Sequence, residues 1–298
     1  MRAVRAIWEI TATARLWWAL THPPATHPWF QRMVVLSTHS NQRHFSWANL
    51  VIKLILGLSL YSPLLLLLLM PAALVFLGLT YGLDCAFRVG GAIAAAYEQG
   101  TFRLLALAPP GALSAAWTLG VSALYRSHDF NRLLTIVQTA LQTGLVLAVL
   151  TNIAVLTFLS PLFTRYPWPA LPTIAGLLSF MAVLLAIYVE YIQSAIVGTL
   201  TGMLAASGSH NRVDTTLWSF GGYMLVQFAT YATTVLLGFW ALEAVLRPTE
   251  IAGALTLPAA SYLRLGMFFG VRELFIRLLW RRLEHQLGYP PGMAFMIG

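Results

Sequence analysis

The sequence predicts an all-α, polytopic membrane protein, and three observations lead to this fold class. First, 58% of the residues are apolar and 9% are charged, whereas soluble domains carry about 25% charged residues. Second, several apolar runs exceed the roughly 20 residues that a helix needs to cross a bilayer. Third, the basic residues behind the net charge of +8 are scattered at the ends of these runs. Because they do not cluster, a nucleic-acid partner is not expected.

Six apolar stretches define a predicted transmembrane domain over residues 46–280. The expected spans cover residues 47–69, 72–97, 133–159, 171–204, 217–246 and 251–280. No charged residue separates the first two spans, and Pro71 lies between them, so a tight hairpin is predicted there. The last stretch is interrupted by charged residues, namely Arg264, Arg272, Glu273 and Arg277. Residues 281–298 are predicted to form a cytoplasmic tail.

Residues 1–45 are predicted to form an amphipathic segment at the membrane interface. Arginine alternates with tryptophan and aliphatic residues over positions 1–20, for example at Arg2, Trp8, Arg15 and Trp17. A helix of this kind lies in the interface, with Trp at headgroup depth and Arg reaching the phosphates. Prolines between positions 22 and 28 end it, and a second amphipathic piece follows from about residue 29 to 42.

The distribution of arginine predicts that both termini are cytoplasmic. Arginines gather before the first span, in the loop after the second span and at the C-terminal end. The remaining loops carry at most one arginine each. With six spans the three basic regions lie on the same side, and basic short loops favour the cytoplasmic side.

The stretch from Ala92 to Gly111 is the most distinctive interval of the chain. Glu98, Gly100 and Thr101 are expected to end one helix and start another, and the Pro109–Pro110 pair closes the segment. Apolar residues surround one charge between these points, at Phe102, Arg103, Leu104 and Leu105. This pattern predicts a short helix at the membrane face between two spans; the alternative is an ordinary cytoplasmic loop.

This stretch resembles the loop after the second span in permeases of the type-2 ABC exporter family. In that family an acidic residue ends the helix, Gly-Thr follows, and a leucine-rich turn leads to a proline. The corresponding residues here are Glu98, Gly100–Thr101, Leu104–Leu105 and Pro109. A second similarity lies at His27-Pro-Trp-Phe-Gln-Arg-Met33, which resembles an Asn-Pro-x-x-x-Arg-Glu segment near the start of such permeases. The chain departs from the family at Met33 and at Arg103, where acidic residues are usual.

The resemblance implies a permease subunit in the plasma (inner) membrane, driven by an ATP-binding cassette ATPase on a separate chain. It also implies a second permease subunit, in a homodimer or a heterodimer. A coupling helix would pass closure of the ATPase to the spans, with its apolar side chains divided between the membrane face and a pocket of the partner. The residues implied in this coupling are Glu98, Gly100, Thr101, Phe102, Arg103, Leu104 and Leu105.

The residues themselves give no sign of catalysis by this chain. No Gly-x-x-x-x-Gly-Lys-Ser/Thr phosphate loop is present, and the single lysine, Lys53, lies in a predicted span. The histidines lack the convergent spacing of a metal site, so neither a metal nor another cofactor is expected. Any ATP hydrolysis is therefore assigned to another chain, and this chain is not predicted to be an enzyme.

Three charged residues lie in the second and fourth predicted spans and are candidate intramembrane polar sites. Asp84 and Arg88 are spaced i,i+4, which lets them pair on one helix face. The pair either neutralises itself for structural reasons or forms a polar patch along a substrate path or subunit seam. Glu190 has no basic neighbour in the sequence. It serves either in a proton relay or substrate contact, or it bonds to neighbouring helices or lies near the cytoplasmic interface.

Two other classes of function compete with the permease. A non-catalytic structural subunit of an electron-transfer or photosynthetic membrane complex would also use the many Trp and small residues for helix contacts. An intramembrane enzyme is disfavoured, because no convergent set of polar residues is apparent. Copurification with an ATPase or with a cofactor-bearing complex separates the first two classes.

Overall fold

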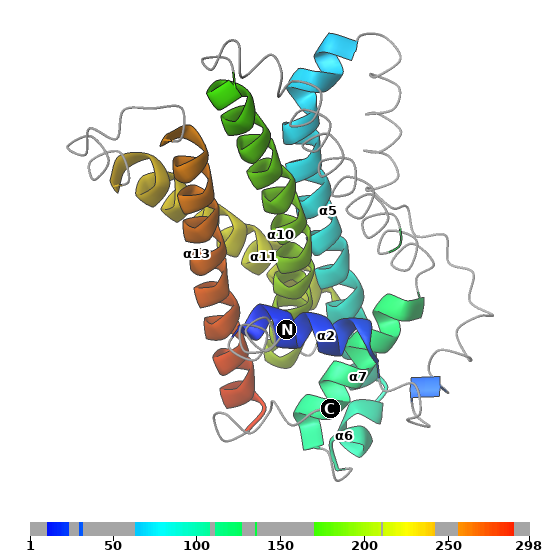
Figure 1. Cartoon of the computed structure of the whole chain (residues 1–298). Helices are drawn as coiled ribbons and strands as arrows, with labels where there is room; N and C mark the ends of the chain where they lie inside the picture. Colours follow the sequence, from blue (N-terminus) through cyan, green and yellow to red (C-terminus); the bar gives the residue numbers. More distant parts are fainter. Residues whose placement is uncertain are drawn as a thin grey trace. The chain divides into compact units, whose positions relative to one another are not determined.

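The computed structural model describes residues 11–23, 30–31, 63–107, 111–126, 135, 170–209, 211–241 and 256–288. The regular structure in these ranges is helical, with no strand, so the all-α prediction is confirmed for them. The helices are α2 (Ala12–Thr21), α5 (Pro63–Glu98), α6 (Thr101–Ala106), α7 (Gly111–Arg126), α10 (Ala170–Gly208), α11 (Arg212–Val235) and α13 (Thr256–Gln286). A π-helical turn, η1 (Leu236–Ala241), continues α11 (Figure 1).

The chain folds into two compact units. The first comprises residues 1–131, 190–228 and 273–298, and the second comprises residues 132–189 and 229–272. The long helices α10, α11 and α13 each contribute one part to each unit. All of the site residues predicted from the sequence belong to the first unit.

Helix α5 begins earlier than the sequence predicts. It starts at Pro63 and runs without a break through Pro71, so the hairpin expected at Pro71 is wrong. Proline is well tolerated in the first turn of a helix, where the missing N–H has no intrahelical partner. Pro71 lies further inside, where apolar helices tolerate a proline when its surroundings satisfy the freed backbone groups.

The other described helices overlap the predicted spans. Helix α10 covers the expected 171–204 span, α11 with η1 covers most of 217–246, and α13 covers most of 251–280. The span at 133–159 falls almost entirely outside the described residues, as does the 47–62 part of the span at 47–69, whose remaining residues belong to α5. Among the described residues, one helical stretch, Arg212–Gly238, meets the length and hydropathy expected of a membrane-crossing helix.

Glycine lets α5 and α10 meet backbone to backbone in the first unit. A Cβ atom at Gly198 of α10 would overlap the carbonyl oxygen of Gly82 on α5, and one at Gly202 would overlap that of Ala86. A Cβ at Gly82 would in turn lie 2.5 Å from the carbonyl oxygen of Ser194. Small residues at these four-residue spacings permit close helix approach.

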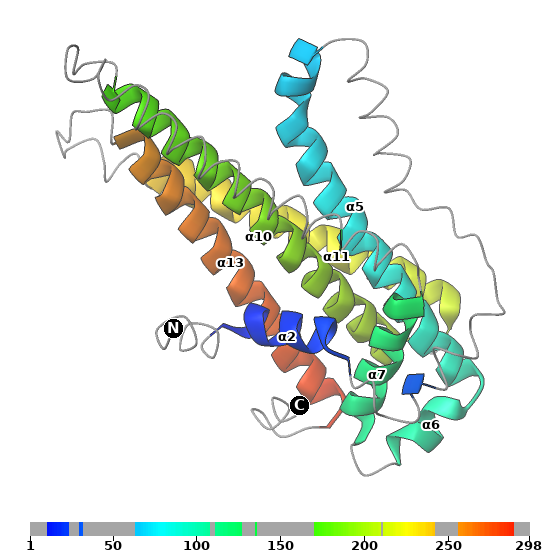
Figure 2. The same cartoon turned by 45° about the vertical axis from the view of Figure 1, so that its right-hand side comes forward.

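Helix α2 packs across this part of the bundle. Figures 1 and 2 show it lying across the C-terminal part of α13, and Gln193 of α10 bonds to Thr13 in its first turn. Its buried face carries Leu16, Trp17 and Leu20, while Arg15 and Trp18 point outward. The apolar face predicted for the interface is therefore covered by protein.

Helices α6 and α7 pack on each other and on α5. The apolar interval 112–125, between the Pro109–Pro110 pair and the predicted 133–159 span, forms the separate helix α7. Tyr125 near its end donates a hydrogen bond to the carbonyl oxygen of Thr21, at 2.9 Å, which ties α7 to α2. Burial raises the pKa of the Tyr125 phenol above its ordinary value, so the phenol remains a donor at neutral pH.

In the second unit, α11 and α13 contact each other through aromatic and basic side chains. The Arg272 guanidinium lies over the rings of Tyr231 and Phe268, at 5.6 and 4.9 Å from their centroids. Arg264 Nε donates a hydrogen bond to the carbonyl oxygen of Gly238 at 3.1 Å. Two of the arginines that interrupt the last predicted span, Arg264 and Arg272, therefore contact α11 or its π-helical continuation, and cation–π contact stabilises Arg272.

Candidate functional site

The predicted coupling segment forms a short helix joined to α5 by a tight turn. Gly100 adopts φ 69°, a left-handed conformation that favours glycine, and this residue reverses the chain between α5 and α6. The Thr101 hydroxyl donates to the carbonyl oxygen of Ala96, at 3.1 Å, and satisfies one of the last carbonyls of α5. The sequence therefore placed the helix break correctly at Glu98–Thr101.

The apolar residues of α6 do not all face outward. Phe102 is 3% exposed and stacks on Tyr97, with ring centroids 4.1 Å apart. Leu104 and Leu107 are 72% and 83% exposed, while Leu105 is half-buried. Phe102 therefore anchors α6 to α5, and the sequence missed Leu107 as an outward-facing residue. Arg103 is exposed beside these leucines.

Glu98 joins this segment to α11. Its carboxylate oxygen Oε1 accepts a hydrogen bond from the backbone N–H of Arg212 at 3.0 Å. Arg212 is the first residue of α11, where backbone N–H groups have no intrahelical acceptor. A carboxylate at a helix N-terminus is also favoured by the helix dipole. The end of α5 and the start of α11 are thus held together at the same place as the α5–α6 turn.

The i,i+4 pairing predicted for Asp84 and Arg88 is confirmed. Arg88 Nε donates to Asp84 Oδ2 at 2.7 Å, and the two side chains are 33% (Asp84) and 16% (Arg88) exposed. Phe87, the residue before Arg88, stacks with Phe220 of α11 at 6.5 Å between centroids. The pair is thus neutralised within α5.

Glu190 belongs to a buried polar cluster that links α10 to α11. The Ser194 hydroxyl donates to Glu190 Oε1 at 2.8 Å. Gln227 Nε2 donates to Ser194 Oγ at 3.1 Å and to the Tyr223 hydroxyl at 2.8 Å. Helix α5 contacts the cluster through Gly78, where an added Cβ would lie 3.1 Å from Glu190 Cγ. The Glu190–Ser194 bond lies within α10, and the cluster reaches the neighbouring helix α11 through Ser194 and Gln227.

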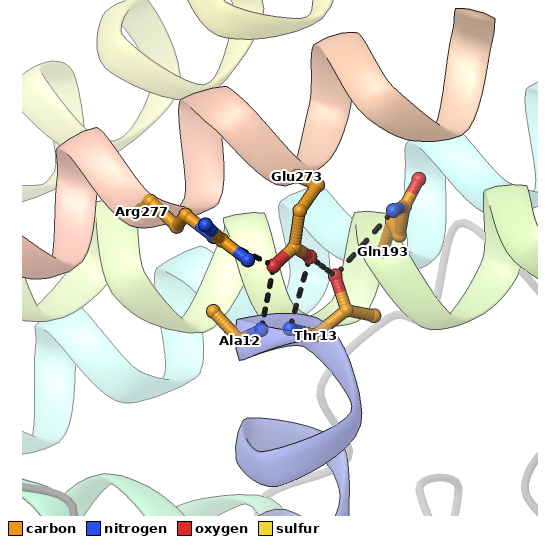
Figure 3. A network of polar contacts seen from close by, with 5 residues as sticks. All are labelled: Ala12, Thr13, Gln193, Glu273 and Arg277. Atoms are coloured by element: carbon orange, nitrogen blue, oxygen red, sulfur yellow. Dashed lines mark hydrogen bonds and ion pairs between the residues drawn. The ribbon is translucent and has the colours of Figure 1, made fainter. Parts of the chain in front are cut away.

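A second carboxylate, Glu273 on α13, holds the N-terminus of α2. It accepts hydrogen bonds from the backbone N–H groups of Ala12, at 2.5 Å, and Thr13, at 3.1 Å, and from the Thr13 hydroxyl at 2.5 Å. Arg277, one turn along α13, donates to Oε1 at 3.0 Å. Gln193 of α10 donates to Thr13 Oγ1 at 3.4 Å, so three helices meet here (Figure 3).

Sequence reasoning missed this network, because its partners are far apart in the chain. Glu273 is read from the sequence only as a charge that interrupts the last span, together with Arg277. Their i,i+4 spacing shows that they can pair, but it gives no sign of α2. The N-cap residue of α2, Thr11, makes no side-chain cap. Because the first N–H groups of α2 have no acceptor from the local N-cap side chain, they are open to an acceptor from another helix. This is a weak indication of the carboxylate that binds there.

The described residues contain no group of three His, Cys, Asp or Glu side chains arranged to hold a metal ion. The short helix α6 carries exposed leucines and stacks on α5 through Phe102, and Glu98 at the end of α5 bonds to the first residue of α11. Comparison with protein-family models, curated proteins and solved structures finds no match to this chain.

Proposed function

We propose that this chain is the membrane-embedded permease subunit of an ATP-driven exporter whose ATPase is a separate chain. In this proposal six spans cross the plasma membrane and both termini are cytoplasmic. Helix α6 is the coupling helix, and a second permease subunit completes the transporter. One observation carries the proposal. Leu104 of α6 and Leu107, the residue that caps its C-terminal end, are exposed on a short helix that is attached near the contact between α5 and α11.

The polarity of α11 supports placement in a bilayer. Its buried face is polar, with Thr215, Ser219, Tyr223 and Gln227 each no more than 2% exposed. Its outward face is apolar and includes Leu217, Trp218, Leu225 and Phe228, each at least 64% exposed. A surface helix in water has the opposite arrangement, whereas a helix in lipid turns its polar side chains toward the bundle. The long apolar helices α5 and α10 fit the same environment.

The connections of α6 support the coupling role. A displacement of α6 is transmitted to α5 through the Phe102–Tyr97 stack and the Gly100 turn. The same displacement reaches α11 through the hydrogen bond between Glu98 and the Arg212 amide. Coupling of an ATPase to spans needs packed elements that both sites bias, and α5 and α11 both flank the Glu190 cluster.

The test is recovery of an ATPase with the chain carrying Leu104→Glu. Leu104 is the informative position because it is exposed, whereas a charge at the buried Phe102 would disturb the chain itself. If Leu104 enters a dry pocket of the partner, an unpaired carboxylate there costs several kcal/mol, on the order of a hundred-fold or more in affinity. We expect the variant to insert normally and to lose most of the ATPase that copurifies with the parent from the same membranes.

The matched control is Leu225→Glu, which places the same charge on an equally exposed leucine of α11, 72% exposed as Leu104 is. In the proposed topology Leu225 faces lipid, so this variant should insert poorly without a specific loss of ATPase per inserted chain. Equal ATPase recovery and turnover for Leu104→Glu and the parent would refute the coupling role. Copurification of a cofactor-bearing complex in place of an ATPase would favour the structural-subunit alternative.

A further inference from the structure

The C-terminal half of α13 carries an exposed stripe that changes character along its length. Leu274 and Leu278 are 57% and 50% exposed, and Arg281, Arg282 and His285 are exposed in the following two turns. Their spacings place all five on one face of the helix, because residues 3, 4, 7 and 8 apart share a face. The stripe is thus apolar over its first two residues and basic over the next three, with two arginines and one histidine.

The acidic residues in the same part of α13 are turned inward. Glu273 is 7% exposed and holds the α2 N-terminus, and Glu284 is 3% exposed and accepts a hydrogen bond from Trp280 Nε1 at 2.8 Å. Trp280 in turn packs edge-on against Trp117 of α7. Among the described residues, no side-chain hydrogen bond or ion pair engages the outward arginines of the stripe, Arg281 and Arg282, or the exposed His285. The outward field at this end of α13 is therefore positive.

Helix α2 lies beside the apolar part of this stripe in the first unit. It contacts α13 at Glu273, immediately before Leu274 in sequence, and it lies across α13 in both views (Figures 1 and 2). Its outward residues include Arg15 and Trp18, and Trp18 is 57% exposed and stacks on His22. Outward Trp and Arg on a transverse helix are typical of the bilayer interface.

We infer that Arg281 and Arg282 bind the headgroups of anionic phospholipids, with Leu274 and Leu278 against their acyl chains. The apolar edge of the bilayer then passes between Leu278 and Arg281. The chemistry recognised is a phosphate-bearing headgroup attached to hydrocarbon, since the arginines supply donors and charge while the leucines require an apolar partner. This inference rests on the proposed membrane location but not on the ATPase.

The experiment titrates the full chain, in mild detergent, with phosphatidylglycerol and with phosphatidylcholine, and counts bound lipids by native mass spectrometry. An arginine near an anionic lipid surface contributes about five-fold in affinity, so Arg281→Gln with Arg282→Gln should weaken phosphatidylglycerol binding about thirty-fold. Phosphatidylcholine binding should hardly change, because that headgroup carries no net charge. The lysine pair Arg281→Lys with Arg282→Lys keeps the charge and should keep most of the phosphatidylglycerol binding.

The matched control removes the same charge elsewhere, by Arg126→Gln with Arg212→Gln, both exposed at the ends of other helices. It should leave phosphatidylglycerol binding at the level of the parent. Equal weakening in the control would show a net-charge effect, and equal binding of the two lipids by the parent would show that no anionic headgroup is selected; either result overturns the inference.

A further arm separates a lipid from a free anion or an acidic protein. Inorganic phosphate added to the titration should not displace phosphatidylglycerol, because it offers nothing to Leu274 and Leu278; displacement overturns the lipid assignment. Lipid binding is measured without the ATPase. Loss of ATPase recovery in Leu104→Glu and loss of lipid selectivity in the arginine variant are therefore independent results.

Discussion

At the scale of single residues, glycines with a steric role can be told apart from glycines without one. Gly198 and Gly202 of α10 face the carbonyl oxygens of Gly82 and Ala86 so closely that no side chain fits. Gly91 of α5, in contrast, has open space where a Cβ would be. A glycine in a helix loses more conformational entropy on folding than an alanine does. It therefore favours the folded chain over alanine only where two backbones must approach each other closely. The α5–α10 crossing is such a place.

The residue-scale prediction compares Gly198→Ala with Gly91→Ala. A methyl group at Gly198 would force α5 and α10 apart, and overpacking of this kind costs about 1–3 kcal/mol. The same change at Gly91 meets nothing and should stabilise the helix by roughly 0.5–1 kcal/mol. The measurement is the midpoint of thermal unfolding of each purified chain in the same detergent. Similar midpoints for the two variants would show that α5 and α10 do not cross at Gly198.

At the scale of elements, two helices are capped by carboxylates that come from other helices. Glu98, the last residue of α5, caps α11 at Arg212, and Glu273 of α13 caps α2 at Ala12 and Thr13. A local cap satisfies backbone N–H groups without fixing the helix in space. A cap from a distant helix satisfies the same N–H groups and also fixes the position of the capped helix. The two carboxylates therefore determine where the short α2 and the start of α11 lie.

The element-scale prediction is that Glu273→Ala releases α2. The buried amides of Ala12 and Thr13 would lose their acceptors, at about 1–3 kcal/mol each, and a loss of about 1.4 kcal/mol raises the open population ten-fold. An Ala12→Cys reporter, buried in the parent, should then react with a maleimide at least about ten times faster. The native Cys85 is buried and adds little background.

The control for α2 release is a Trp18→Cys reporter, at a position that is exposed already. Its reaction rate should be nearly the same in the parent and in the Glu273→Ala background. An unchanged rate at Ala12→Cys in the Glu273→Ala background would mean that the apolar face of α2 alone holds the helix in place.

At the scale of the whole molecule, the proposed function depends on how the chain crosses the membrane. The polar inner and apolar outer faces of α11 favour a lipid environment, as does the stripe on α13. The six-span layout rests further on the apolar stretches and on the arginine distribution of the sequence. Because α5 begins at Pro63, this layout requires the first span to end before that residue. In the proposed layout α6 and the end of α13 both lie on the cytoplasmic side.

The corresponding prediction concerns labelling of single cysteines in intact cells by an impermeant maleimide. Cysteines placed next to Arg165 and next to Arg247 should react from outside. Gln99→Cys and Arg282→Cys should react only after the membrane is opened. Gln99 is preferred to Gly100 as the reporter, because a side chain at φ 69° would strain the turn. Reaction of Gln99→Cys in intact cells would contradict the proposed topology.

Much of the helix content and part of the candidate site follow from the sequence alone. Apolar runs predict the long helices, the Gly-Thr pair predicts the break before α6, and i,i+4 spacing predicts the Asp84–Arg88 pair. Each of these depends on residues within a few positions of one another, where helix geometry determines the outcome. The hairpin predicted at Pro71 is wrong because that prediction was also local. Rules for proline in sequence do not include the surroundings that let α5 continue through Pro71.

Only the tertiary structure decided which side chains face inward. It buries Phe102 and leaves Leu104 and Leu107 outside, and it brings Glu273 to α2 across more than 250 residues of sequence. Side-chain burial and long-range capping depend on which helices become neighbours. Helix periodicity and the four-residue spacing of small residues give the faces of one helix that can approach another closely. They do not say which helix becomes the neighbour, as Gly82 of α5 does for Gly198 of α10.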